Sequence, residues 1–289
     1  EIWNRRKSGD LFVESATIRA IRGAGGEVAH YVSIFTDITE RKVAERQLQK
    51  DLQLAKQIQQ RVVSPPLCDD HIRIEAHYAS SEALGGDMYA WQRIGPGRYG
   101  IFLMDVMAPG VAASLIGMSV RSLLHGSMLQ LDAPAEVMSA LNRHMRGLYF
   151  REYDRDVPLY FFTAIYLVVD TNRRLIHYVN AGHPPAILAD ADGHARKLGD
   201  GGVPIGVLAQ PDIAACTLSF EPGSRLLLYT DGLIEAAGAS LYEGIERLSR
   251  LAADRRAEAN GAFIDRVARE FIGQRPHGDD VCIISASLR

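Results

Sequence analysis

Runs of apolar residues predict strands along most of the chain. After residue 65 they are Ile72–Ala79, Met88–Ile94, Tyr99–Val106, Phe161–Val169, Leu175–Asn180, Ile187–Ala189, Ala214–Phe220, Arg225–Thr230 and Val281–Ala286. Apolar residues at helical spacing predict four helices in the same region: Val111–Leu131, Pro134–Phe150, Leu241–Asp254 and Phe263–Ile272. Consecutive strands interrupted by helix pairs predict an α+β domain with an antiparallel core, because regular βαβ winding would alternate the two element types.

The first 38 residues have a different pattern. Leu11–Arg22 and Glu27–Thr36 are β-prone and are separated by a glycine-rich break, which predicts a hairpin. Two strands alone are marginally stable in water, so we expect this hairpin to belong to a larger sheet that begins before residue 1.

Residues 39–64 are dense in charge and glutamine and predict one helix. Its apolar seam has 4-3-4-3 spacing and consists of Leu48, Leu52, Ala55, Gln59 and Val62. The seam fits either a short coiled coil or one amphipathic helix lying on its own domain. Ser64-Pro65-Pro66 ends the helix, so the sequence predicts three parts, 1–38, 39–64 and 65–289.

Composition and charge exclude several classes of protein. Hydrophobic residues make up 47% and charged residues 23%, which argues against wholesale disorder. A net charge of -3 offers no electrostatic footprint for nucleic acid or an anionic membrane. The longest apolar run, Leu159–Val169, is shorter than the roughly 20 residues of a membrane helix. Three widely spaced cysteines predict a reducing, cytoplasmic location, and the missing initiator Met and leader predict a piece of a longer protein.

Candidate chemistry lies in aspartates at the ends of predicted strands. Asp87 opens a strand after two glycines, Asp105 lies near a strand end, Asp231 follows a strand, and Asp279 and Asp280 precede the last one. A carboxylate beside a buried strand is costly unless it is solvated, paired or bound to a metal. Oxygen ligands without thiolate or imidazole neighbours favour Mg²⁺ or Mn²⁺ over zinc. Each aspartate alone is more simply explained as a turn or cap residue, so the hypothesis rests on the whole set.

Residues 76–289 resemble the SpoIIE-type branch of the PPM metal-dependent protein serine/threonine phosphatases. The resemblance is carried, in family order, by blocks 85–89 (GGDMY), 105–113 (DVMAPGVAA), 162–164 (FTA), 180–185 (NAGHPP), 202–206 (GVPIG), 229–235 (YTDGLIE) and 278–281 (GDDV). It implies a β-sandwich of two antiparallel sheets flanked by helices, with two Mg²⁺ or Mn²⁺ ions at one end.

By motif position the resemblance also implies the residues of the site. The expected metal ligands are Asp87, Asp105, Asp231, Asp279 or Asp280, and the backbone carbonyl of Val106. Which of the adjacent pair binds stays open at this point. Divalent cations would lower the pKa of a shared water, which would attack phosphoserine or phosphothreonine. Asp87, Asp105 and Asp231 are therefore the expected catalytic residues.

The family resemblance extends to the substrate. In this branch it implies bacterial signalling, with a phosphorylated STAS-type anti-sigma-factor antagonist as the protein that is dephosphorylated. The chain departs from the family pattern at Ala90, where an acid is usual, and at Ala108 and Pro109, where Gly and a basic residue are usual. A catalytically silent pseudophosphatase that serves as a binding module is therefore the alternative. His183 fits either a general acid or a histidine in a structural turn.

The N-terminal segment resembles the closing half of a PAS sensor domain, with an Asp-Ile-Thr-Glu-Arg-Lys exit at 37–42 into the helix. Continuity between this exit and the catalytic region suggests that the 39–63 helix pairs with its copy in a homodimer. A changed helix register would then reposition Val111–Phe150 against Asp105.

Overall fold

The computed structural model describes residues 1–107, 110–149, 160–273 and 278–289. Within them the chain divides into two compact units, Glu1–Lys56 and Gln57–Arg289. Helix α1 (Thr39–Val62) contributes residues to both units.

The first unit contains a three-stranded antiparallel sheet. Strand β2 (Leu11–Arg22) pairs with β3 (Val28–Asp37), as the hairpin pattern predicts, and also with β1 (Ile2–Arg5), which the sequence analysis missed. Large apolar side chains remain exposed on β2 and β3, including Ile34 and Phe35. The PAS assignment and the three-part division of the chain stay predictions.

The second unit contains two packed sheets. The first has the order β11 (Ala195–Leu198), β10 (Ala186–Ala189), β14 (Arg225–Tyr229), β15 (Val281–Leu288), β5 (Ile72–Ala79), β4 (Leu67–Cys68). The second has the order β12 (Gly201–Gly202), β9 (Leu175–Ala181), β8 (Phe162–Asp170), β7 (Arg98–Val106), β6 (Met88–Gly95), and β13 (Cys216–Ser219) also pairs with β9. Neighbouring strands are antiparallel except β12 and β9, which are parallel.

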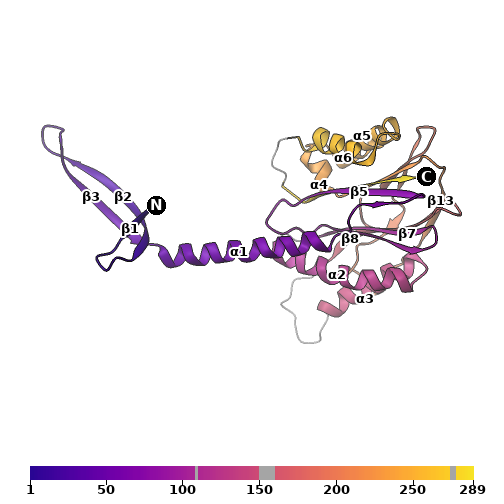
Figure 1. Cartoon of the computed structure of the whole chain (residues 1–289), viewed down its shortest axis with the longest axis horizontal. Helices are drawn as coiled ribbons and strands as arrows, with labels where there is room; N and C mark the ends of the chain where they lie inside the picture. The colour runs from indigo at the N-terminus through magenta and orange to yellow at the C-terminus, as the bar shows by residue number, and fades with distance from the viewer. Residues whose placement is uncertain (108–109, 150–159, 274–277) are drawn as a thin grey trace. The chain divides into compact units, whose positions relative to one another are not determined.

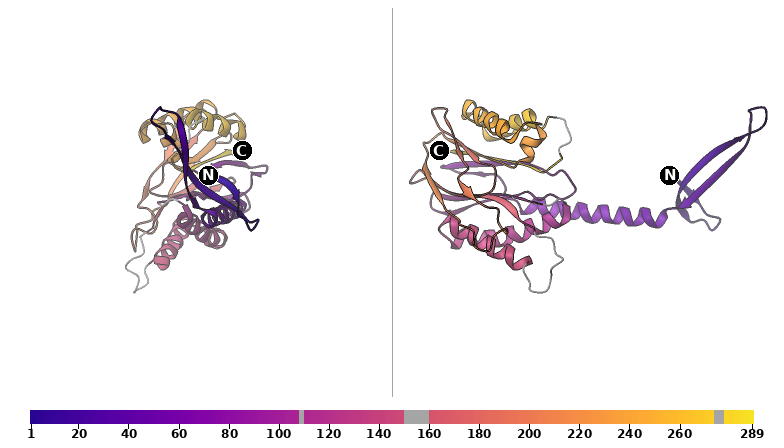
Figure 2. Two further views of the ribbon diagram at one scale, coloured as in Figure 1. Left: turned by 90° about the vertical axis from the view of Figure 1, so that its left-hand side faces the viewer. Right: turned by 180° about the vertical axis from the view of Figure 1, so that it is seen from behind.

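Helices cover the outer faces of both sheets (Figure 1). Those on the second sheet are α2 (Gly110–Gln130) and α3 (Pro134–Tyr149). Those on the first sheet are α4 (Gly232–Ala236), α5 (Leu241–Asp254) and α6 (Asn260–Phe271). The view from behind shows the same helix–sheet–sheet–helix layering (Figure 2). The predicted antiparallel sandwich flanked by helices is confirmed. The predicted helix end at Phe150 lies outside the described residues.

Side-chain alternation along β6 shows how the sequence builds these layers. Tyr89 and Trp91 point into the apolar core between the sheets, where their rings stack 5.1 Å apart. Met88 and Ala90 point the other way, into the core under α2 and α3. This period of two is what a strand buried on both faces requires. Position 90 therefore lies in an apolar layer.

One cation, Arg225 on β14, is completely buried. Its guanidinium donates hydrogen bonds to Asn260 Oδ1 at 3.1 Å and Ser285 Oγ at 2.6 Å, and to the backbone carbonyls of Arg256 and Glu258. Burial lowers the pKa of Arg225 to about 10, so the side chain stays charged at neutral pH. It fastens the α5–α6 connection to the first sheet.

Every helix in the described ranges is too short or too polar to cross a lipid bilayer.

Candidate metal centre

Strand register places Asp87 and Asp105 together. In the β6–β7 pair Met88 lies opposite Met104, so the residue before β6 is next to the end of β7. Asp87 is buried, with 2% of its surface exposed, and its charge interacts with that of Asp105. This proximity follows from the antiparallel register, because the two acids occupy facing positions at the same end of the strand pair.

The other predicted aspartates come from the first sheet. Tyr229 lies opposite Ile283, so the end of β14 is next to the start of β15, and Asp231 and Asp279 lie close together there. Thr230 joins the two sheets at this end. Its hydroxyl donates to Asp87 Oδ2 at 2.7 Å and accepts from the Cys282 N–H at 2.9 Å. The sequence analysis gave Thr230 no role.

These residues surround one cavity of about 610 Å³. Of the predicted site residues, Asp105, Val106, Asp231, Asp279 and Asp280 line it. Asp87 is buried and follows the lining residue Gly86 in the sequence. The described lining residues also include Glu82 and Thr163 but no lysine or arginine. The structure thus brings all the sequence-predicted side chains to one end of the sandwich.

Two carboxylates at this site, those of Asp87 and Asp105, ionise with difficulty. Burial, followed by the charge of Asp105, raises the pKa of Asp87 well above its usual value. Burial, followed by the charge of Asp231, raises the pKa of Asp105 to about 7. Buried acids that repel one another need a positive partner to be stable in the charged form. Because the donors are all oxygens, this set fits Mg²⁺ or Mn²⁺.

The adjacent acids Asp279 and Asp280 differ in their surroundings. Asp280 is buried and its two oxygens accept hydrogen bonds from Ser81 N–H (2.8 Å), Ser81 Oγ (3.1 Å), Gly86 N–H (2.6 Å) and Asp87 N–H (3.4 Å). Asp279 is exposed on the cavity and accepts from the Asp280 N–H at 2.7 Å. The Asp280 carboxylate thus holds the backbone of the loop that contains Asp87.

Gly85 in that loop has no room for a side chain. A Cβ placed on it would collide with the hydroxyl of Tyr78 and with the Asp280 carboxylate. The two glycines before Asp87 therefore allow the backbone to approach the Asp280 carboxylate closely.

Thr163 is a cavity residue to which the sequence analysis assigned no role. It lies opposite Asp105 in the β7–β8 pair, and its hydroxyl is 2.8 Å from His183 Nδ1. The backbone of His183 is held by Asn180, whose amide makes two hydrogen bonds of 2.8 Å. Burial lowers the pKa of His183 to about 3, so the imidazole is neutral at physiological pH. These contacts favour the structural-turn interpretation of His183 over the general acid.

Two of the departures from the family pattern, Ala108 and Pro109, lie outside the described residues.

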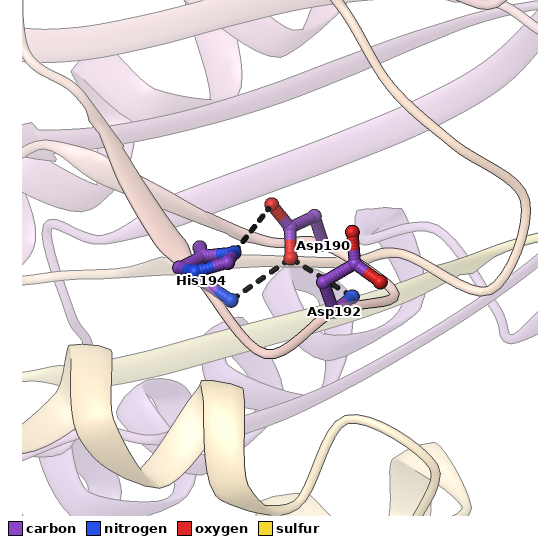
Figure 3. Close-up of side chains that lie close together, drawn as sticks. All are labelled: Asp190, Asp192 and His194. Carbon is purple, nitrogen blue, oxygen red and sulfur yellow. Dashed lines mark hydrogen bonds and ion pairs between the residues drawn. The ribbon is translucent and has the colours of Figure 1, made fainter.

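A second acidic group lies elsewhere, in the turn between β10 and β11 (Figure 3). Asp190, Asp192 and His194 bring ligand atoms within 4.8 Å of one another there, and they form the single such group among the described residues. Asp190 Oδ1 accepts from the backbone N–H groups of Asp192 (3.0 Å) and His194 (2.8 Å). This is the hydrogen bonding of an Asx turn, which explains the cluster without an ion. The aspartates of the cavity, all of them within the described ranges, do not form a group of three with ligand atoms this close together.

Comparison with known proteins gives consistent matches. The family model for stage II sporulation protein E (SpoIIE) matches residues 95–289. Phosphoserine phosphatase RsbP of Bacillus subtilis (strain 168) is 37% identical over 193 residues, which cover 67% of this chain and 47% of RsbP. The chain thus spans about half the length of this curated relative.

Solved structures agree on the fold. The SiaA-PP2C domain of Pseudomonas aeruginosa superposes with a TM-score of 0.67 at 21% identity, covering 85% of this chain and 99% of that domain. RsbX in complex with magnesium gives 0.60 at 16% identity, covering 78% and 99%. At these identities the similarity establishes the architecture alone. With the family model covering most of the catalytic unit, the chain belongs to the SpoIIE family of PPM phosphatases.

Proposed function

We propose that this protein is a metal-dependent protein serine/threonine phosphatase in bacterial signalling. One observation carries the proposal: acids from the ends of both sheets meet at a single cavity whose described lining has no lysine or arginine. Such a site attracts divalent cations and, through them, a phosphate group. Membership of the SpoIIE family and the name of RsbP, a phosphoserine phosphatase, support the same reaction.

Asp87, Asp105, Asp231 and Asp279, together with the backbone carbonyl of Val106, are the proposed ligands of two Mg²⁺ or Mn²⁺ ions. When bound, such ions lower the pKa of water and neutralise charge on phosphoryl oxygens. Thr230 holds the Asp87 carboxylate by its 2.7 Å hydrogen bond, and Asp280 holds the backbone of the same loop. Strands fixed by apolar layers on both faces keep these groups in place before substrate arrives.

For the substrate we propose a phosphorylated STAS-type anti-sigma-factor antagonist, on the basis of the family resemblance. We further propose a cytoplasmic homodimer that pairs through α1. The three free cysteines support the location, and the exposed Leu48 on α1 supports the pairing. A purified phosphorylated STAS-type protein should lose its phosphate faster than a phosphoserine peptide of the same sequence.

The decisive experiment is hydrolysis of para-nitrophenyl phosphate with and without Mn²⁺. We expect turnover that requires the metal and falls by at least about 100-fold in Asp231→Asn, because one proposed ligand is lost. Asp265→Asn, which makes the same change on the exposed side of α6, should match the wild type. Equal turnover in wild type and Asp231→Asn would contradict the proposal. No turnover in any variant at millimolar metal would favour the pseudophosphatase alternative.

A further inference from the structure

Gln59 stands out on α1 because of its burial. Of the 24 residues of this helix, all of which are described, Gln59 alone is buried, with 3% of its surface exposed. It lies in the second compact unit, which begins at Gln57. A buried polar side chain needs hydrogen-bonding partners, and here they come from outside the helix.

The partner is the backbone of Gly85. Gln59 Nε2 donates to the Gly85 carbonyl at 2.7 Å, and the Gly85 N–H donates to Gln59 Oε1 at 3.4 Å. The carboxamide therefore pairs with both polar groups of one residue, as a neighbouring strand would. Position 85 must be glycine in this arrangement, because Tyr78 and Asp280 fill the space that a side chain would need.

The loop that contains Gly85 and Asp87 is held by two side chains, Asp280 and Gln59. Asp280, on the first sheet, accepts hydrogen bonds from Gly86 and Asp87 N–H. Gln59 holds the residue before them from the linker helix. The end of α1 has a second attachment, since Arg121 Nε on α2 donates to the Val62 carbonyl at 3.1 Å. The last turns of α1 are thus built into the support of the candidate metal centre.

We propose that Gln59 is a positioning residue for the Asp87 metal ligand. It acts through the Gly85–Asp87 backbone, which keeps the Asp87 carboxylate in place beside Asp105 and on its hydrogen bond from Thr230. Loss of the Gln59–Gly85 hydrogen bonds would release this loop and weaken metal binding. This inference rests on the proposed function, because it requires Asp87 to bind a metal.

The test is Mn²⁺ binding to the full 289-residue chain, measured by calorimetry, with Gln59→Met as the variant. Methionine has a similar shape but leaves the Gly85 carbonyl without its donor. Loss of a group that supports a metal ligand typically costs about 10-fold in affinity or more, and we expect a weakening of about 10-fold. The control is Gln60→Met, the same substitution at the exposed neighbouring position, which should bind as the wild type does. In EDTA, Gln60→Met should melt as the wild type does, and Gln59→Met should still unfold cooperatively, although at a lower temperature because the buried Gly85 carbonyl has lost its donor.

Two further measurements separate the possible outcomes. At saturating Mn²⁺, Gln59→Met should recover the wild-type KM for para-nitrophenyl phosphate, whereas a general structural defect would not be corrected by metal. If wild type and Gln59→Met bind Mn²⁺ equally, the positioning role is wrong although the proposed function stands. If the wild type binds no Mn²⁺, the proposed function itself fails. Should Gln59→Met not fold, Gln59→Leu removes the same donor without adding a titratable group, and unchanged binding by that variant overturns the inference.

Discussion

The ionised Asp105 carboxylate should destabilise the metal-free protein, which gives a sharp test of the site. Burial and the neighbouring charge of Asp231 raise the pKa of Asp105 to about 7, whereas its ordinary value is 3.8. The folded state therefore binds a proton more tightly than the unfolded state does. As the pH rises from about 4 through about 7, the folded protein must give up that proton, and its stability falls. Replacing Asp105 with Asn removes the ionisation and should stabilise the metal-free protein at pH 8.

The magnitude follows from the two pKa values. One pKa unit corresponds to about 1.4 kcal/mol, so the difference between 3.8 and about 7 is worth roughly 4 kcal/mol once Asp105 is fully ionised. Asp105 is only partly buried by the protein around it, and water at the cavity mouth reduces the penalty. We therefore expect Asp105→Asn to raise the free energy of unfolding by roughly 2–4 kcal/mol at pH 8. For a unit of this size that corresponds to roughly 5–15 °C in Tm.

The assay is thermal or urea unfolding in excess EDTA at pH 5 and pH 8. At pH 5 Asp105 is already protonated in the folded wild type, so the difference between wild type and Asp105→Asn should shrink. Asp265→Asn, on the exposed side of α6, controls for the loss of one negative charge and should change neither value. Added Mn²⁺ should stabilise the wild type and leave Asp105→Asn nearly unaffected, because a proposed ligand is missing.

Lower stability of Asp105→Asn than of the wild type in EDTA at pH 8 would refute this reasoning. It would mean that hydrogen bonds made by the Asp105 carboxylate outweigh its burial and the repulsion from Asp231. A gain of the same size at both pH values would also count against it, since ionisation would then not be the cause.

Four other variants test separate parts of the structure. Asp279→Asn should weaken Mn²⁺ binding in calorimetry with little effect on unfolding in EDTA. Asp280→Asn should instead lower the free energy of unfolding in EDTA by about 1–3 kcal/mol, because charged hydrogen bonds to the Ser81 and Gly86 backbone are lost. Glu at both Leu48 and Leu52 should convert the proposed dimer to a monomer in analytical ultracentrifugation, and an unchanged sedimentation mass would exclude pairing through this seam. Arg225→Met should lower the free energy of unfolding in urea by about 3–5 kcal/mol, since buried carbonyl and amide oxygens lose their donors.

Much of the catalytic fold was predictable from apolar periodicity. Helix Leu241–Asp254 and strand Ile72–Ala79 have the predicted bounds, because a strong amphipathic or alternating pattern coincides with a capping residue or a turn. Short edge strands such as Gly201–Gly202 were missed, since glycine carries no apolar signal and the pairing depends on a distant partner. Strand β1 was missed for a similar reason, because all four of its residues are exposed.

The candidate site was predictable as a set of acids but not in its details. Aspartates at strand ends mark positions that antiparallel register can bring together, and the family blocks point to the same residues. The different surroundings of Asp279 and Asp280 depend on Ser81 and Gly86, which are nearly 200 positions away in the chain. Gln59 was assigned to the apolar seam of the linker helix only because its position continues the 4-3-4-3 spacing. Its burial against Gly85 is a tertiary contact that no local pattern indicates.

The close packing around Gly85 should restrict which residues can occur together at positions 78, 85 and 280 in homologues. Tyr78 and Asp280 already occupy the volume that a side chain at position 85 would need. A homologue with alanine or a larger residue there must therefore have a smaller side chain at one or both of the other positions, and the three should co-vary when many homologues are aligned. Enlargement of residue 85 alone would be selected against, so a larger residue there should be accompanied by a change at position 78 or 280.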